Sequence, residues 1–300
     1  MAVTAGRFEV MIRQRLGALT RMLPAARSGE VTAVHQARVA TRRLREVLPL
    51  VSRGSPLRKH TRAVRRLTRT LGPVRELDVA LLTLDEFADT GEVPRAGILS
   101  LHQAIRQERS RLQIDMRRTI DRARLDKLSG KLIADARKRD KEGPRPRTVD
   151  PKQLAAARDR VARRAERLRI TIENAAAIYL PDRLHEVRIA AKKLRYAMEI
   201  VRDLSGSRAT ARIATLKRAQ DLLGRIHDLE VLIARTRALQ GSSSNAPTLR
   251  VSADMDLLVR RLENECRRLH GRYIAMRAPL LTICDHVTRV QTARRRASAA

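Results

Sequence analysis

Apolar residues recur every three or four positions along most of the 300-residue chain, which is the period of amphipathic α-helices. Short connections between long helices of this kind favour antiparallel neighbours, so the pattern predicts an all-α fold built as helical bundles. The helices should end at Pro and Gly residues. These are Pro24, Gly54 with Pro56, Gly91 with Pro94, and the segment 143–146. Gly72-Pro73 predicts a kink within one long helix, because proline removes a backbone donor and crowds the preceding turn.

A polar, charged and Pro-rich segment, KRDKEGPRPRTVD at 138–150, predicts a linker between two bundles. The first bundle would cover 1–137 and the second 151–290, and 291–300 predicts a frayed basic tail.

Breaks are also expected within the second bundle. One helix should run over about 151–179, with a break at Pro181 and further helices ending near 204, 223 and 240. The segment 241–247 predicts a flexible loop, followed by a helix over about 248–276, a break at Pro279 and a short last helix.

Two motifs occur twice in the same order. HQARVATRRLREVL (35–48) matches HEVRIAAKKLRYAM (185–198) at an offset of 150, and LGPVRELDV (71–79) matches LGRIHDLEV (223–231) at an offset of 152. Such self-similarity indicates a duplicated unit. We therefore expect two four-helix bundles related by internal duplication, with a pseudo-two-fold axis between them.

The His-led motif separates apolar from basic residues on an ideal helix. The apolar side carries Leu44, Ala37, Ala40, Val47 and Leu48 in the first copy, and Leu194, Val187, Ala190, Ala197 and Met198 in the second. The opposite side carries His35, Arg38, Arg42 and Arg45, and then His185, Arg188, Lys192 and Arg195. Arg43 and Lys193 flank this basic side.

The next helix adds a narrow column of guanidiniums, made by Arg58, Arg62, Arg65 and Arg69, with Arg66 beside it. The corresponding column in the second copy has fewer basic residues. Lys217 aligns with Arg65, Arg218 with Arg66, and His227 with Arg75. Glu76 and Asp228 follow the last pair, and we interpret them as orienting nearby guanidiniums or as ordinary surface acids.

The overall composition supports the interpretation that the protein presents a basic surface. The 64 Lys+Arg residues outnumber the 32 Asp+Glu residues, which gives a net charge of +32, and both halves of the chain share the excess. Aromatic residues are only 2%, which disfavours all-β folds and binders that stack single-stranded bases. Cys266 and Cys284 make neither a disulfide framework nor a zinc set, and we expect them to be buried apolar residues. No signal peptide or apolar span is evident, so we expect a cytoplasmic protein.

Clustered guanidiniums suit a phosphate polymer. Their forks bind phosphate oxygens bidentately, and a row of them one helical turn (about 5.4 Å) apart matches a linear anion. A merely solvated basic face would usually intersperse acids four residues away, but the first stripe has only Glu46 nearby. A histidine beside such an anion would tend to protonate below about neutral pH.

These motifs resemble the CHAD family, the conserved-histidine α-helical domains. The resemblance covers nearly the whole chain and implies two four-helix bundles that bind inorganic polyphosphate through a basic central surface. It implies that the signature histidines are His35 and His185. The basic positions that it implies are Arg38, Arg42, Arg43, Arg45, Arg65, Arg188, Lys192, Lys193, Arg195 and Lys217. Adjacent cations complete the expected set, namely Arg62, Arg66 and Arg218.

The first hypothesis is therefore a non-enzymatic polyphosphate-binding module, with recruitment to polyphosphate granules as its role in the cell. The second is a nucleic-acid-binding protein, since a charge of +32 alone would also predict one. A third is a phosphotransferase or hydrolase acting through His35 or His185, but no Gly-rich phosphate loop or acidic cluster accompanies them. We expect no catalytic residue, cofactor, metal ion or membrane partner, and the sequence leaves the oligomeric state open.

Overall fold

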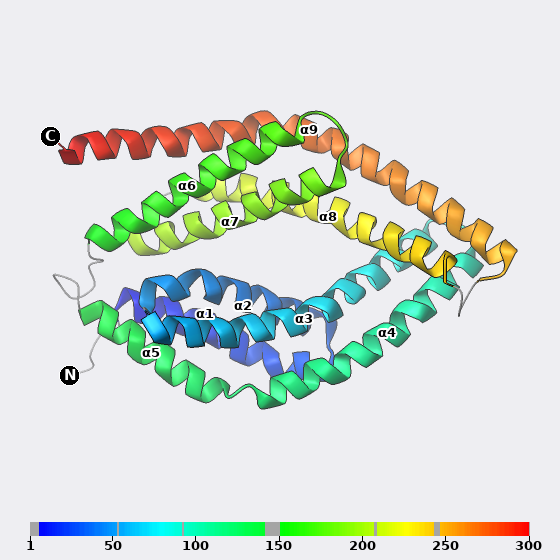
Figure 1. Ribbon diagram of the computed structural model, residues 1–300, viewed down its shortest axis with the longest axis horizontal. Coiled ribbons are helices and arrows are strands. Elements are labelled where there is room, and N and C mark those ends of the chain that lie inside the picture. Colours follow the sequence, from blue (N-terminus) through cyan, green and yellow to red (C-terminus); the bar gives the residue numbers. More distant parts are fainter. Residues whose placement is uncertain are drawn as a thin grey trace. The chain divides into compact units, whose positions relative to one another are not determined.

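A computed structural model describes residues 6–52, 54–91, 93–141, 151–206, 209–242 and 247–299 (Figure 1). These residues form nine α-helices and no strand, which confirms the all-α prediction. The helices are α1 (Arg7–Ser28), α2 (Val31–Val51), α3 (Gly54–Asp89), α4 (Arg95–Arg122), α5 (Leu125–Lys141), α6 (Pro151–Ala175), α7 (Pro181–Ser205), α8 (Thr210–Gln240) and α9 (Leu249–Ala299).

The chain packs into two compact units, and each takes segments from both halves of the sequence. Unit 1 comprises Met1–Arg75, Arg109–Arg158 and Glu199–Arg208, and unit 2 comprises Glu76–Glu108, Asp159–Met198 and Ala209–Ala300. Helices α3, α4, α6 and α7 each contribute to both units. The units therefore differ from the consecutive stretches 1–137 and 151–290. The two copies of the His-led motif nevertheless lie in different units, so each unit carries one basic helix.

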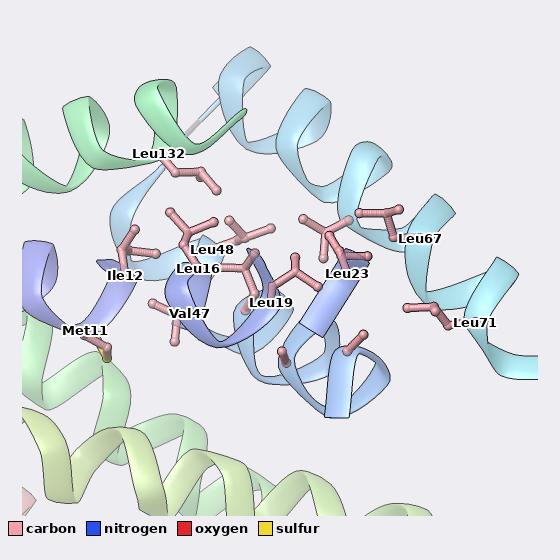
Figure 2. Close-up of a cluster of buried hydrophobic side chains, with 14 of the residues drawn as sticks. Met11, Ile12, Leu16, Leu19, Leu23, Val47, Leu48, Leu67, Leu71 and Leu132 are labelled. Carbon is pink, nitrogen blue, oxygen red and sulfur yellow. The ribbon is translucent and has the colours of Figure 1, made fainter. Parts of the chain in front are cut away.

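The core of unit 1 is built by the apolar stripes of α1, α2 and α3, with α5 packed against α1 and α2 (Figure 2). Ile12 of α1, Leu44 and Leu48 of α2 and Leu71 of α3 are all fully buried. Burying a leucine or isoleucine side chain stabilises the fold by about 1.5–3 kcal/mol. This packing fixes the rotation of α2 and α3 and so decides which of their residues face outward.

The turn between α1 and α2 is closed by Gly29, which has a φ of +90°. Its N–H donates to the Ala26 carbonyl at 3.0 Å, and the next N–H donates to the Ala25 carbonyl at 3.1 Å. A side chain at Gly29 would be strained at this φ and would overlap Gln113 of α4. The glycine therefore allows the short turn that makes α1 and α2 antiparallel neighbours.

Unit 2 is built around α8 and α9, which pack along one another. Leu194 of α7, Leu232 of α8 and Tyr273 of α9 are fully buried. Arg235 of α8 joins the unit's α3 and α4 segments, because it donates to Glu76 at 3.0 Å and to Glu108 at 2.6 Å. Glu76 is thus an orienting carboxylate, as expected, and its guanidinium partner is on α8.

Several predicted helix ends are wrong, and four prolines lie inside described helices beyond the first turn, namely Pro24, Pro49, Pro73 and Pro279. α1 continues through Pro24 and α9 through Pro279 as far as Ala299, whereas the predicted continuation of α3 through Pro73 is confirmed. Each proline is exposed and lies close to buried apolar residues on the same helix. Packing on the buried side therefore holds the helix, while the carbonyl that loses its hydrogen bond faces water.

Other boundaries of the second half differ in detail. The break expected near 223 is absent, since α8 runs unbroken over Thr210–Gln240, and α6 ends at Ala175 rather than 179. The predicted break at Pro181 is confirmed because α7 begins there. The predicted tail at 291–300 is helical as far as Ala299.

Some predicted segments lie largely outside the described residues. These are 142–150 of the linker and 243–246 of the loop, while 138–141 of the linker is the end of α5. Cys266 and Cys284 are each 1% exposed, which confirms them as buried residues. Among the described helices, none is both long and apolar enough to cross a membrane.

Candidate functional site

Helix α2 presents the two faces that its sequence predicts. Every predicted apolar position is buried, and Ala37, Leu44 and Val47 are completely so. On the other side His35 and Arg45 are exposed, whereas Arg38 and Arg42 are half-buried.

In unit 1 the guanidiniums of α2 and α3 lie close enough to repel one another. Partial desolvation lowers the pKa of His35, and three neighbouring guanidiniums lower it further, those of Arg75, Arg38 and Arg42. Partial desolvation and the charge of Arg65 lower the pKa of Arg45, opposed by Glu46 and assisted by Arg69. We call this set basic cluster 1, made up of His35, Arg38, Arg42, Arg45, Arg65, Arg69 and Arg75.

The column of Arg62, Arg65 and Arg69 on α3 has no ion-pair partner among the described residues. Arg65 and Arg69 are exposed, as is Arg62 in the same column, and none makes an ion pair with a described residue. Like charges held together cost free energy unless a counter-charge is supplied. The cluster is thus arranged to gain from an external anion.

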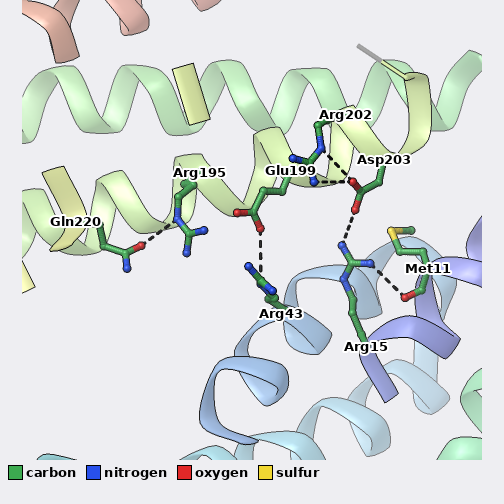
Figure 3. A network of polar contacts seen from close by, with 8 residues as sticks. All are labelled: Met11, Arg15, Arg43, Arg195, Glu199, Arg202, Asp203 and Gln220. Atoms are coloured by element: carbon green, nitrogen blue, oxygen red, sulfur yellow. Dashed lines mark hydrogen bonds and ion pairs between the residues drawn. The ribbon is translucent and has the colours of Figure 1, made fainter. Parts of the chain in front are cut away.

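Two predicted site residues of unit 1 point elsewhere. Arg43 lies 3.8 Å from Glu199, at the edge of a pocket of about 360 Å³ that Arg15, Arg202 and Asp203 also line (Figure 3). Arg66 lines a different pocket of about 250 Å³, beside the turn between α4 and α5. Neither residue belongs to basic cluster 1.

The ion pairs around Arg43 hold the end of α7 in unit 1. Arg15 donates to Asp203 at 2.9 Å and to the Met11 carbonyl at 3.2 Å, and Arg202 donates to Asp203 at 3.0 Å (Figure 3). The two carboxylates, Glu199 and Asp203, balance part of this positive charge. The network is therefore better suited to fixing α7 than to binding an anion.

Unit 2 carries the second copy of the basic helix on α7. His185, Arg188 and Lys192 are half-buried, while Lys193 is exposed. Burial lowers the pKa of Arg188, and Asp228 of α8 opposes that effect. The charge of Asp228 therefore acts on the basic helix, which fits the orienting interpretation of this residue better than that of an ordinary surface acid. We call His185, Arg188, Lys192, His227 and Asp228 basic cluster 2.

One packing detail is the same in both copies. The Nε of Arg38 lies 3.7 Å from the position of a Cβ on Gly72, and the Nε of Arg188 lies 3.6 Å from the equivalent position on Gly224. In each copy the arginine of the basic helix thus lies beside a glycine of the following helix, at van der Waals distance from where a Cβ would be. The repeated sequence motifs thus produce a repeated contact.

The second copy holds its other cations differently. Arg195 is only 6% exposed and donates to Gln220 at 3.1 Å (Figure 3). Its guanidinium carbon lies 4.5 Å from the ring centre of Tyr196. Tyr196 stands where the first copy has Glu46, and a tyrosine ring attracts a guanidinium. Arg195 is therefore less accessible than its counterpart Arg45.

The column on α8 is also weaker than the column on α3. Lys217 pairs with Asp221 at 2.9 Å, and Arg218 donates to Thr215 at 3.1 Å, although both cations are exposed. The column of Arg62, Arg65 and Arg69 on α3 thus keeps more uncompensated charge than Lys217 and Arg218 on α8.

Sequence reasoning did not place Arg69, Arg75 or His227 among the site residues. Arg69 and Arg75 act on the charge of α2, and His227 lies directly against His185 with Nδ1 atoms 3.2 Å apart. The alignment of LGPVRELDV with LGRIHDLEV contains the available signal, because it equates Arg75 with His227. That His227 contacts His185, and that Arg75 acts on the charge of His35, becomes apparent only in three dimensions.

Comparison with known proteins identifies the fold. A family model described as the CHAD domain matches residues 10–237, which include both copies of both motifs. The chain belongs to the CHAD family. No curated protein matches the sequence.

Solved structures of similar fold agree with that assignment. The crystal structure of the CHAD domain from the plant Ricinus communis is 22% identical, with a TM-score of 0.69 over 93% of this chain and 93% of that one. PptA from Streptomyces chartreusis is 16% identical, with a TM-score of 0.56 over 96% of this chain and 98% of that one. At these identities the likeness establishes that the CHAD fold is shared.

Proposed function

We propose that this CHAD domain binds inorganic polyphosphate, without catalysing its turnover, through the basic helices of its two units. The observation that carries the proposal is the column of guanidiniums in basic cluster 1. Arg65 and Arg69 on α3 act on the charge of Arg45, and neither makes an ion pair with a described residue. A chain of phosphates supplies negative charges at regular spacing and can accept hydrogen bonds from successive guanidiniums.

The proposal is tested by titrating labelled polyphosphate at two salt concentrations, with duplex DNA as competitor. We expect tight binding that weakens steeply with salt, because each neutralised phosphate releases counterions. We also expect polyphosphate to displace DNA at equal phosphate concentration. Equal affinity for the two polymers would support a general nucleic-acid binder instead.

A double variant locates the site. Arg45→Ala with Arg65→Ala removes two facing guanidiniums and should weaken binding by at least about tenfold, since hydrogen bonds between charged groups contribute about 1.5–3 kcal/mol each. Arg118→Ala is the matched control, because Arg118 is an exposed arginine of unit 1 on α4, paired with Asp115. Equal losses in the double variant and the control would place binding outside basic cluster 1.

Two readouts test the remaining parts of the proposal. Phosphate release from polyphosphate should stay at the rate without protein, and hydrolysis that disappears in His35→Ala or His185→Ala would mean that the domain is an enzyme. In cells, a fluorescent fusion should collect on polyphosphate granules, and the Arg45→Ala, Arg65→Ala variant should not.

A further inference from the structure

The contact between His185 and His227 is a further feature of unit 2. Their Nδ1 atoms are 3.2 Å apart and their ring centres 4.4 Å apart. Unit 1 has no equivalent pair, because the position of His227 in the repeat is taken by Arg75. The same place in the two copies thus carries a permanent cation in one and a titratable imidazole in the other.

The geometry of the pair limits its charge. A hydrogen bond between two Nδ1 atoms needs one that carries a proton and one that offers a lone pair. The intact contact is therefore either neutral, with two neutral rings, or singly positive, with one imidazolium donating to one imidazole. Two imidazoliums would point both protons at each other, so the second proton requires that the contact breaks.

Burial and the neighbouring charges determine how readily the His185–His227 pair takes up its first proton. Burial lowers the pKa of His185, and the charges of Arg188 and Lys192 on α7 lower it further. Asp182 and Glu186 on the same helix raise it. From α8, the neighbouring groups are His227 itself and Asp228, whose charge acts on Arg188. Burial and the cations therefore favour the neutral form of His185, and a bound anion would offset the cations.

We infer that the His185–His227 pair is a proton switch that sets the anion affinity of unit 2. The pair adds no charge at alkaline pH and adds one positive charge to basic cluster 2 when it takes up a proton. Because the coupling is reciprocal, anion binding also draws a proton onto the pair. Unit 1 has Arg75 at the same place and keeps its charge at all cellular pH values. The inference takes its ligand from the proposed function, whereas the titration of the pair does not depend on it.

The first experiment uses the free protein. Histidine side-chain ¹⁵N spectra recorded from pH 8.5 to pH 5 should show His185 and His227 titrating together in two separated steps, with one shared Nδ1 proton in the intermediate. In His227→Gln, His185 should titrate in one step. Independent single-step titration of the two rings in the wild-type protein would overturn the inference.

The second experiment exchanges the residues between copies. His227→Arg places in unit 2 the residue that unit 1 has, and should bind polyphosphate more tightly than wild type at pH 8. The affinity of the wild-type protein for polyphosphate should increase from pH 8 to pH 5.5. The increase in His227→Arg should be about tenfold smaller, because one proton linked over about one pH unit changes the affinity about tenfold. Arg75→His is the reciprocal variant and should bind more weakly at pH 8 and recover part of that loss at pH 5.5.

The outcomes separate the two proposals. If His227→Arg keeps the full wild-type dependence on pH, the switch is wrong even though polyphosphate binds. If polyphosphate does not bind at any pH, the proposed function is wrong, and the ¹⁵N titration still decides whether the pair shares a proton. The circular dichroism spectra of His227→Arg and Arg75→His should match that of the wild-type protein. If either variant unfolds, the ¹⁵N titration of His227→Gln still tests the inference.

Discussion

At the scale of single residues, Asp140 secures the start of α1. Its two carboxylate oxygens accept hydrogen bonds from the backbone N–H groups of Phe8 and Glu9, each at 3.0 Å. The first N–H groups of a helix have no partner within the helix, and a carboxylate there also compensates the helix dipole. A residue at the end of α5 thus caps the first helix of unit 1.

We predict that Asp140→Ala lowers the free energy of unfolding by about 1–2 kcal/mol, the usual effect of losing a helix cap. Urea denaturation followed by circular dichroism measures it. Asp115→Ala, which removes an exposed aspartate from the interior of α4, serves as the control and should change stability less. A result in which both variants lose the same stability would mean that the cap contributes nothing.

Glu9, in the first turn of α1, has a buried carboxylate. Burial raises its pKa, but hydrogen bonds from Arg13 and Arg137 outweigh that effect and hold the pKa below its ordinary value of 4.5. A carboxylate whose pKa is lowered by folding stabilises the protein above about pH 4.5, and this stabilisation disappears as the pH falls through the folded-state pKa.

We therefore predict that Glu9→Gln is less stable than wild type at pH 7 and that the difference in melting temperature narrows between pH 5 and pH 3. Glu173→Gln provides the control, because Glu173 is an exposed partner of Arg169 within one helix turn. A difference that stays constant down to pH 3 would contradict the assignment of a lowered pKa to Glu9.

At the scale of helices, Pro24, Pro73 and Pro279 share one arrangement, as does Pro49 near the end of α2. Pro24, Pro73 and Pro279 are exposed, and the helix on each side is anchored by buried apolar residues. Proline in the interior of a helix costs about 3 kcal/mol relative to alanine. These helices therefore persist because burial outweighs the local penalty.

Pro279→Ala should accordingly raise the melting temperature, since it restores one hydrogen bond in α9 without touching the core. Differential scanning calorimetry measures the gain. Ala278→Gly, at the neighbouring exposed position, should lower the melting temperature and controls for general sensitivity of this turn. A loss of stability in Pro279→Ala would mean that α9 needs the proline's bend.

The sequence predicts helix faces better than helix ends. Periodicity placed Leu44 and Leu194 in the core, because one buried stripe per helix leaves a strong local pattern. It misplaced the ends at Pro24 and near 223, because tertiary packing decides whether a helix passes a proline or glycine. The His185–His227 contact was also missed, because it joins two helices whose relative rotation is set by the core.

At the scale of the whole molecule, a net charge of +32 repels itself. Such repulsion destabilises a compact state, and salt screens it over a Debye length of about 10 Å at 0.1 M. We predict that the melting temperature rises with sodium chloride concentration at neutral pH. A melting temperature that falls with salt would mean that internal ion pairs dominate over the net repulsion.

Polyphosphate should raise the melting temperature at low salt, because a ligand that binds the folded state stabilises it. Monophosphate at the same total phosphate concentration is the control and should raise it much less, since single anions cannot span several guanidiniums. Equal shifts from the two would indicate screening rather than binding.

The exchange of segments between the units has a practical consequence for dissecting the protein. Ile200 and Leu204 come from the second half of the sequence yet are buried in the core of unit 1, and Glu76–Glu108 comes from the first half yet belongs to unit 2. Cutting the gene at the linker would leave both fragments with an incomplete interior. A separate unit would instead have to be made by joining its own three segments in one chain, or by co-expressing those segments as fragments that associate.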